Sequence, residues 1–247
     1  MLPLFRKIRY RLAEDNQFLK YSRYAIGEIV LVVIGILIAL QINSWKQDIE
    51  SGRTERSYMQ ELKNNLIADS VEIKKDLVFN KKKLEIVGEF LKIFEVQLTN
   101  EERFAIFEEY SKPFTSYRVF NPKMTTWNNL LSSEKLSVLK DTNLRNLLID
   151  YYGYDYSGGV QERIVFMNRK IIDDNYKKFV TKQFVQNNYG ISTQFSDNSS
   201  LSVHLDQEFF SDLYGVSYII NLQNTFFEDL LRKIRSMIEL LDENLAN

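Results

Sequence analysis

The chain has 247 residues, a formal net charge of −1 and no cysteine. The missing cysteine excludes disulfides, thiolate zinc sites and cysteine nucleophiles, and the balanced charge gives no reason to expect nucleic acid as a partner. Three prolines, nine glycines, 17 Phe and 14 Tyr predict an all-α fold with few breaks and a packed core, rather than a turn-rich β fold or disorder.

Residues 1–23 form a basic segment with amphipathic character. The segment holds six basic and two acidic residues, a net charge of +4. Its apolar residues fall on one face at helical spacing, which is typical of a helix lying in the membrane interface. The cations predicted to contact lipid headgroups there are Arg6, Lys7, Arg9 and Arg11. The alternative is a short basic tail that only sets the topology of the chain.

The next stretch, residues 24–42, is the strongest pattern in the chain. Its sequence, YAIGEIVLVVIGILIALQI, contains only two strongly polar residues, Glu28 and Gln41. At about 1.5 Å per residue the helix extends roughly 28 Å, close to the hydrocarbon thickness of a bilayer. A helix that is apolar on every side is typical of a transmembrane helix. Tyr24 and Trp45 stand at its two ends, as expected of interfacial anchors.

Positive charge is concentrated on the N-terminal side of this span. Beyond it, Lys46, Arg53 and Arg56 lie among acidic residues. The positive-inside rule therefore places residues 1–23 in the cytoplasm and residues 43–247 across the membrane. A cleaved signal peptide is the alternative, but no A-x-A-like site follows the apolar run, so we predict an uncleaved single-pass anchor.

Three residues of the span share one helical face. At about 100° per residue, Gly35 and Ala39 lie within some 20° of Glu28, and Gly35-x-x-x-Ala39 is a small-xxx-small contact pattern. We predict that Glu28, Gly35 and Ala39 form a contact stripe against another span, from a second copy or a partner membrane protein. The alternative is that Glu28 only reaches toward the interface and that the small residues are incidental.

Residues 43–98 are predicted to form one long helix that continues from the span as a stalk. Apolar residues recur every seven positions, which is typical of a coiled-coil-like seam. A second apolar strip widens the predicted buried face, so the helix is expected to pack into a bundle. The seam consists of Met59, Leu66, Ile73, Asn80, Val87 and Phe94 with Leu77, Leu84, Leu91 and Leu98, and the strip of Ile67, Val71, Val78 and Phe90.

Three shorter helices are predicted next, each with an N-terminal cap. Residues 99–112 carry a capping box between Thr99 and Glu102. After a break that contains two prolines, residues 125–134 are expected to be capped by Thr125 or Thr126, and residues 141–153 by Asp141.

The segment YYGYDYSGG, residues 151–159, has two interpretations. Exposed tyrosines would form a binding surface, because Tyr offers contact area at low entropy cost, whereas buried tyrosines would close a turn between helices. Helices are predicted over 160–184 and 216–245, with an exposed polar loop over 186–204. The last helix repeats apolar residues every seven positions and is expected to pack antiparallel to the first long helix.

The sequence contains no pattern that is typical of catalysis or metal binding. The single histidine, His204, lies in the polar loop, and neither HExxH nor a phosphate-binding glycine loop occurs. Adjacent carboxylates such as Glu101–Glu102 are typical of solvated helix faces. We therefore predict no catalytic residue, no metal and no cofactor.

Two stretches resemble one protein family. The stretch YAIGEIVLVVIGILIALQINSW, preceded by FRKIR, is similar to the N-terminal signature of a domain-of-unknown-function family of single-span envelope proteins in Gram-negative bacteria. Residues 125–152, TTWNNLLSSEKLSVLKDTNLRNLLIDYY, resemble a second block of that family, except that Glu134 and Lys135 stand where its turn has glycine. The resemblance implies an inner-membrane anchor and a periplasmic helical domain, with no assigned activity or site residues.

These patterns predict a membrane-anchored interaction protein of the cell envelope, acting as a sensor or a scaffold. Its predicted partners are the lipid bilayer and, through the span, a second copy or another membrane protein. A second possibility is an accessory subunit of an ion- or proton-coupled membrane complex, with Glu28 as a titratable group. An envelope enzyme is the least favoured class.

Overall fold

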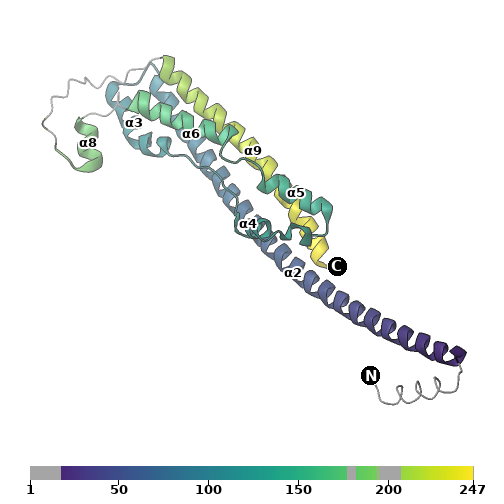
Figure 1. Cartoon of the computed structure of the whole chain (residues 1–247). Helices are drawn as coiled ribbons and strands as arrows, with labels where there is room; N and C mark the ends of the chain where they lie inside the picture. Colours follow the sequence, from purple (N-terminus) through teal and green to yellow (C-terminus); the bar gives the residue numbers. More distant parts are fainter. Residues whose placement is uncertain (1–17, 177–181, 193, 195–206, 247) are drawn as a thin grey trace. The chain divides into compact units, whose positions relative to one another are not determined.

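The structure, a computed structural model, describes residues 18–176, 182–192, 194 and 207–246 (Figure 1). Within these ranges every regular element is helical, which confirms the predicted all-α fold. The chain divides into two compact units, Met1–Ser57 and Tyr58–Asn247. The elements are α2 (Phe18–Leu91), η1 (Lys92–Phe94), α3 (Asn100–Thr115), α4 (Thr125–Ser132), η2 (Lys135–Val138), α5 (Thr142–Tyr152), α6 (Gly159–Ile171), η3 (Ile172–Tyr176), α8 (Lys182–Tyr189) and α9 (Gln207–Ala246).

Helix α2 contains both the predicted span and the first helix of the second unit. Its 74 residues form one α-helix, as predicted for a span that continues into a longer helix. No residue between Tyr24 and Ile42 is buried within the chain. Among the described helices, this one is long and apolar enough to cross a membrane.

In the second unit, the buried face of α2 follows the predicted seven-residue series. The buried members are Met59, Leu66, Ile73, Asn80 and Val87. The second apolar strip is wrong at three of its four positions, because Ile67, Val71 and Val78 are 42%, 46% and 71% exposed.

A different set of residues completes the buried face of α2. Each member lies three residues after a member of the first series, which is the spacing of the second core position in a heptad. The set consists of Leu62, Asp69, Asp76, Lys83 and Phe90, all buried. Three of the five are charged, so a search for apolar periodicity does not find them.

Helix α9 packs along α2 in the opposite direction within the second unit. Lys63 of α2 pairs with Asp242, Asn80 bonds to Gln223 at 2.8 Å, and the Phe90 and Phe209 rings lie 6.5 Å apart. As the residue numbers increase along α2, those of the contacting residues on α9 decrease, so the two helices are antiparallel. Two hydrophobic clusters fill the unit, one that includes Leu66, Trp127 and Phe227, and one that includes Phe90, Phe114 and Leu213.

Helix α9 begins at Gln207, nine residues before the predicted start. Gly215 is inside the helix and does not end it. A Cβ at this position would lie 2.8 Å from Cε of Met167 on α6. The glycine therefore permits the close packing of α6 against α9 that Figure 1 shows.

The predicted caps at Thr99 and Asp141 are confirmed. Thr99 Oγ1 accepts from the Glu102 amide at 3.3 Å, and Glu102 Oε2 accepts from the Thr99 amide at 2.7 Å. Asp141 Oδ1 accepts from the amides of Asn143 and Leu144 at 2.9 and 3.1 Å.

The predicted threonine cap of α4 is wrong. The N-cap residue is Met124, which makes no side-chain cap bond. The Thr126 hydroxyl is instead used between helices: it accepts from Asn65 Nδ2 at 2.9 Å and donates to Glu61 Oε2 at 3.3 Å. A long-range interaction has therefore replaced the local one that the sequence suggested.

The turn after α4 has the backbone geometry that glycine favours. Glu134 adopts φ 55°, the only described non-glycine residue with a positive φ. Most non-glycine residues avoid this region because Cβ approaches the backbone. Glutamate therefore occupies here the left-handed turn position at which the resemblance led us to expect glycine.

The helix predicted over 160–184 is corrected by the structure. Helix α6 ends at Ile171 and is followed by one π-helical turn, η3. Residues 177–181 lie outside the described residues, and α8 extends to Tyr189, into the range predicted as loop. Most of that loop, including His204, also lies outside the described residues.

Candidate functional site

The predicted contact stripe of the span lies on α2. Gly35 and Ala39 are exposed and Glu28 is partly buried. A Cβ at Gly35 would meet nothing within 4 Å, so this face is open within the chain. The predicted anchors Tyr24 and Trp45 are also exposed. The contact of this stripe with another span stays a prediction, and Arg6, Lys7, Arg9 and Arg11 lie outside the described residues.

In the second unit, the buried face of α2 carries three charged residues and one asparagine. We call this set the polar layer; it consists of Asp69, Asp76, Asn80 and Lys83. Asp69 Oδ2 accepts from the Tyr151 hydroxyl at 2.9 Å, and its Oδ1 accepts from the Lys123 amide at 3.1 Å. Burial raises the pKa of Asp69, and these two hydrogen bonds oppose the shift.

Asp76 is held beside an arginine from the segment after α3. Arg118 Nε lies 3.0 Å from Asp76 Oδ1, and Arg118 Nη2 donates to Glu72 Oε1 at 2.7 Å. Burial raises the pKa of Asp76, whereas the guanidinium acts in the opposite direction. One arginine therefore joins two carboxylates of α2.

Lys83 is buried among neutral acceptors. Its ammonium donates to the carbonyl of Ser116 and, at 2.6 Å, to Oδ1 of Asn168 on α6. Burial lowers the pKa of Lys83 to about 7. One turn before it, Asn80 Nδ2 donates to Gln223 Oε1 of α9 at 2.8 Å.

The polar layer connects α2 to several elements, because Asp69 bonds to α5, Lys83 to α6 and Asn80 to α9. Buried polar groups of this kind fix the alignment of helices, because a shifted register would leave them unpaired. The sequence analysis missed the three charged members. Their signal was present in the seven-residue spacing from Leu62 to Phe90.

The tyrosine-rich segment after α5 combines the two interpretations that its sequence allowed. Tyr151, Tyr152 and Tyr156 are buried, whereas Tyr154 is 51% exposed. The Tyr156 hydroxyl donates to the Tyr151 carbonyl at 3.0 Å and closes the turn. The Tyr154 ring stacks on Phe226 of α9, with centroids 5.8 Å apart, and meets Tyr156 edge-on at 5.0 Å.

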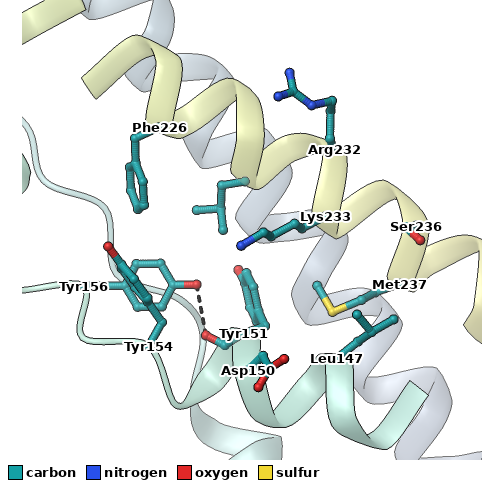
Figure 2. Close-up of a pocket in the computed structure, with 11 residues that line it drawn as sticks. Leu147, Asp150, Tyr151, Tyr154, Tyr156, Phe226, Arg232, Lys233, Ser236 and Met237 are labelled. Atoms are coloured by element: carbon teal, nitrogen blue, oxygen red, sulfur yellow. Dashed lines mark hydrogen bonds between the residues drawn. The ribbon is translucent and has the colours of Figure 1, made fainter. Parts of the chain in front are cut away.

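A cavity of about 350 Å³ opens between this segment, α5 and α9 (Figure 2). Aromatic and aliphatic side chains make most of its wall, and charged residues stand among them. We call it the tyrosine cavity; its lining consists of Leu147, Asp150, Tyr151, Tyr154, Tyr156, Phe226, Leu230, Arg232, Lys233, Ser236 and Met237. It lies wholly within the second unit.

The described residues contain no group of three or more His, Asp or Glu side chains placed to hold a metal ion. Asp69, Asp76 and Lys83, whose pKa values are shifted, are buried between helices and do not line the tyrosine cavity. The tyrosine cavity, whose wall is largely aromatic and aliphatic, is the candidate site.

Comparison with known proteins identifies one family. A family of unknown function, DUF6090, matches residues 28–184, which include most of the apolar stretch and every element from there through α6. No curated protein and no solved structure gives a significant match.

Proposed function

Since the chain belongs to the DUF6090 family, which has no known function, we propose from the structure that it is a membrane-anchored interaction protein of the cell envelope. It acts as a sensor or a scaffold. The apolar part of α2 carries this proposal, because a stretch of that length with no buried residue needs a lipid or protein surface to cover it.

The proposed topology is a single inner-membrane span with a cytoplasmic N-terminus. Its support is the excess of basic residues before the span. The resemblance of the span to that of single-span envelope proteins of Gram-negative bacteria supports the inner membrane as its location and the periplasm as the location of the second unit. In this arrangement Tyr58–Asn247 is a periplasmic helical bundle, and the lack of cysteine suits any compartment.

Binding is favoured over catalysis by the way the second unit uses its polar groups. Asp69 and Lys83 are engaged in hydrogen bonds that join helices, so they are not presented to a substrate. The open feature of the unit is the tyrosine cavity, whose wall is largely apolar. An apolar cavity with a few polar groups is typical of ligand-binding sites.

Cysteine labelling tests this topology directly, because the native chain contains no cysteine. We expect Ser132→Cys, at an exposed position of the second unit, to react with a membrane-impermeant maleimide in intact spheroplasts. Gln17→Cys, before the span, should react only after lysis. Labelling of both positions or only of Gln17→Cys before lysis, or loss of the N-terminus from the mature protein, would contradict the proposal.

A further inference from the structure

We infer that the tyrosine cavity binds a small amphipathic carboxylate, with its apolar body among the aromatic rings and its carboxylate on Lys233. This ligand class gives the proposed sensor something to sense. The inference depends on residues of Tyr58–Asn247 alone, so it does not require the proposed membrane orientation.

The two buried tyrosines of the cavity wall have hydrogen-bond partners for their hydroxyls within the protein. The Tyr151 hydroxyl donates to Asp69 at 2.9 Å, and the Tyr156 hydroxyl donates to the Tyr151 carbonyl at 3.0 Å. Both groups are therefore already used by the protein. Phe226, Leu230 and Met237 continue the apolar wall. Such a wall favours an apolar body, because burying it removes apolar surface from water at no cost in lost hydrogen bonds.

Lys233 supplies the charge that selects an anion. It is exposed, its amine extends toward the tyrosine rings in Figure 2, and no carboxylate in the described structure pairs with it. The neighbouring cation, Arg232, is paired with Asp229 and points away from the rings. Lys233 is therefore the cation available to a ligand at this site.

The volume of the cavity and its other polar groups restrict the range of ligands further. A volume of about 350 Å³ is at the small end of ligand sites and suits a single ring or a short chain. Asp150 also lines the cavity and disfavours a second negative charge. A multiply phosphorylated ligand therefore fits poorly, and a sugar would find few partners for its hydroxyls beyond Asp150, Tyr154 and Ser236.

The test uses the full-length protein in nanodiscs, with empty nanodiscs as the reference, and two probes that share one apolar body. Phenylpropionate carries a carboxylate and phenylpropanol does not. By isothermal titration calorimetry we expect saturable binding of phenylpropionate, about fivefold tighter than that of phenylpropanol, as for one partly exposed ion pair.

Two variants and two matched controls separate the roles of charge and ring. Lys233→Gln should remove the preference for phenylpropionate, and Tyr154→Ala should weaken both probes about fivefold or more. Arg235→Gln and Tyr214→Ala, at exposed positions of α9 that do not line the cavity, should leave both affinities unchanged. Lys233 and Tyr154 are exposed, so circular dichroism should show an intact fold in both variants.

Three outcomes would overturn the inference. The first is no saturable binding above empty nanodiscs. The second is equal affinity for the two probes in the native protein, which removes the carboxylate from the ligand class. The third is an equal effect of Lys233→Gln and Arg235→Gln on the preference for phenylpropionate, which removes the assigned contact. None of these results bears on the labelling pattern that tests the membrane topology.

Discussion

Lys83 is buried in the core, and the two groups that accept hydrogen bonds from its ammonium are neutral. Because its pKa is lowered to about 7 in the folded chain, against about 10.4 when unfolded, the unfolded state binds more protons between these values. The free energy of unfolding should therefore rise as pH increases from about 7 toward 9. Denaturant titrations at several pH values should show this rise in the native chain and lose it in Lys83→Met.

The neighbouring exposed lysine provides the control for this prediction. Lys82 lies on the same helix with its side chain in solvent, so Lys82→Met should leave the pH dependence as it is. An equal rise of stability with pH in Lys83→Met and in the native chain would show that another group is responsible. A substitution that lowers the free energy of unfolding equally at every pH does not affect this comparison, because the comparison uses only the change of that free energy with pH.

Tyr151 bonds to the polar layer and also lines the tyrosine cavity. Its hydroxyl donates to Asp69, whose buried carboxylate has a raised pKa. Tyr151→Phe leaves that carboxylate with one donor fewer, and we expect a loss of about 1–3 kcal/mol in the free energy of unfolding at pH 7. Tyr154→Phe removes a hydroxyl from an exposed side chain and should cost less than about 0.5 kcal/mol. Equal losses in a urea titration would contradict this.

At the scale of the helix, the contact stripe of the span predicts how substitutions affect the association of two copies of the chain. If Glu28, Gly35 and Ala39 contact another span, then Gly35→Leu or Ala39→Leu should weaken self-association by about 1 kcal/mol, because the larger side chains separate the helices. Gly27→Leu, about 100° from Glu28 on the same helix, should have no effect. Fluorescence energy transfer between labelled copies in lipid vesicles measures the association. Equal effects at Gly27 and Gly35, or none at all, would exclude the stripe as a contact between two copies of the chain.

Helix α2 also shows how far periodicity predicts packing. The series from Met59 to Val87 is apolar except at Asn80, and its burial was predicted correctly. The partner series was missed except at Phe90, because Asp69, Asp76 and Lys83 occupy it. The other three residues of the apolar strip that was chosen in its place are exposed. Charged residues are buried there because Tyr151, Arg118 and Asn168 reach them from distant segments. Such partners cannot be found within one helix.

Helix caps also differ in whether they could be predicted from nearby residues alone. Thr99 and Asp141 cap their helices through contacts with residues two or three positions on, and these caps were predicted from spacing alone. Thr126 was predicted as a cap, but its side chain bonds across to α2. The local prediction fails at Thr126 because its hydroxyl bonds to another helix and not to the backbone of its own.

At the scale of the molecule, the all-α fold was predictable and the tyrosine cavity was not. Composition and two long periodic stretches predict helices that pack together, because both signals depend on short spacings. The cavity requires residues 147–156 and 226–237 to meet, and its volume depends on which side chains leave space between them. The run of tyrosines was the one indication of it, and a buried turn was the other interpretation of that run.

The second unit should fold without the first, because its core begins where the division between the units lies. Met59 is the first buried hydrophobic residue among those described, and both hydrophobic clusters consist of residues from Tyr58 onward. We therefore expect a chain of residues 58–247 to be soluble, helical by circular dichroism and cooperative in thermal unfolding.

A shorter chain of residues 67–247 provides the matched control for this fragment. It lacks Met59, Leu62 and Leu66, and each large buried side chain that is lost costs about 2–5 kcal/mol, which together is comparable to the stability of a typical domain. We expect it to unfold or aggregate while the longer fragment stays folded. If the fragment 58–247 instead aggregates or melts without a cooperative transition, its core depends on residues before Tyr58. Equal stability of the two fragments would show that the Met59–Leu66 turns contribute little to the core.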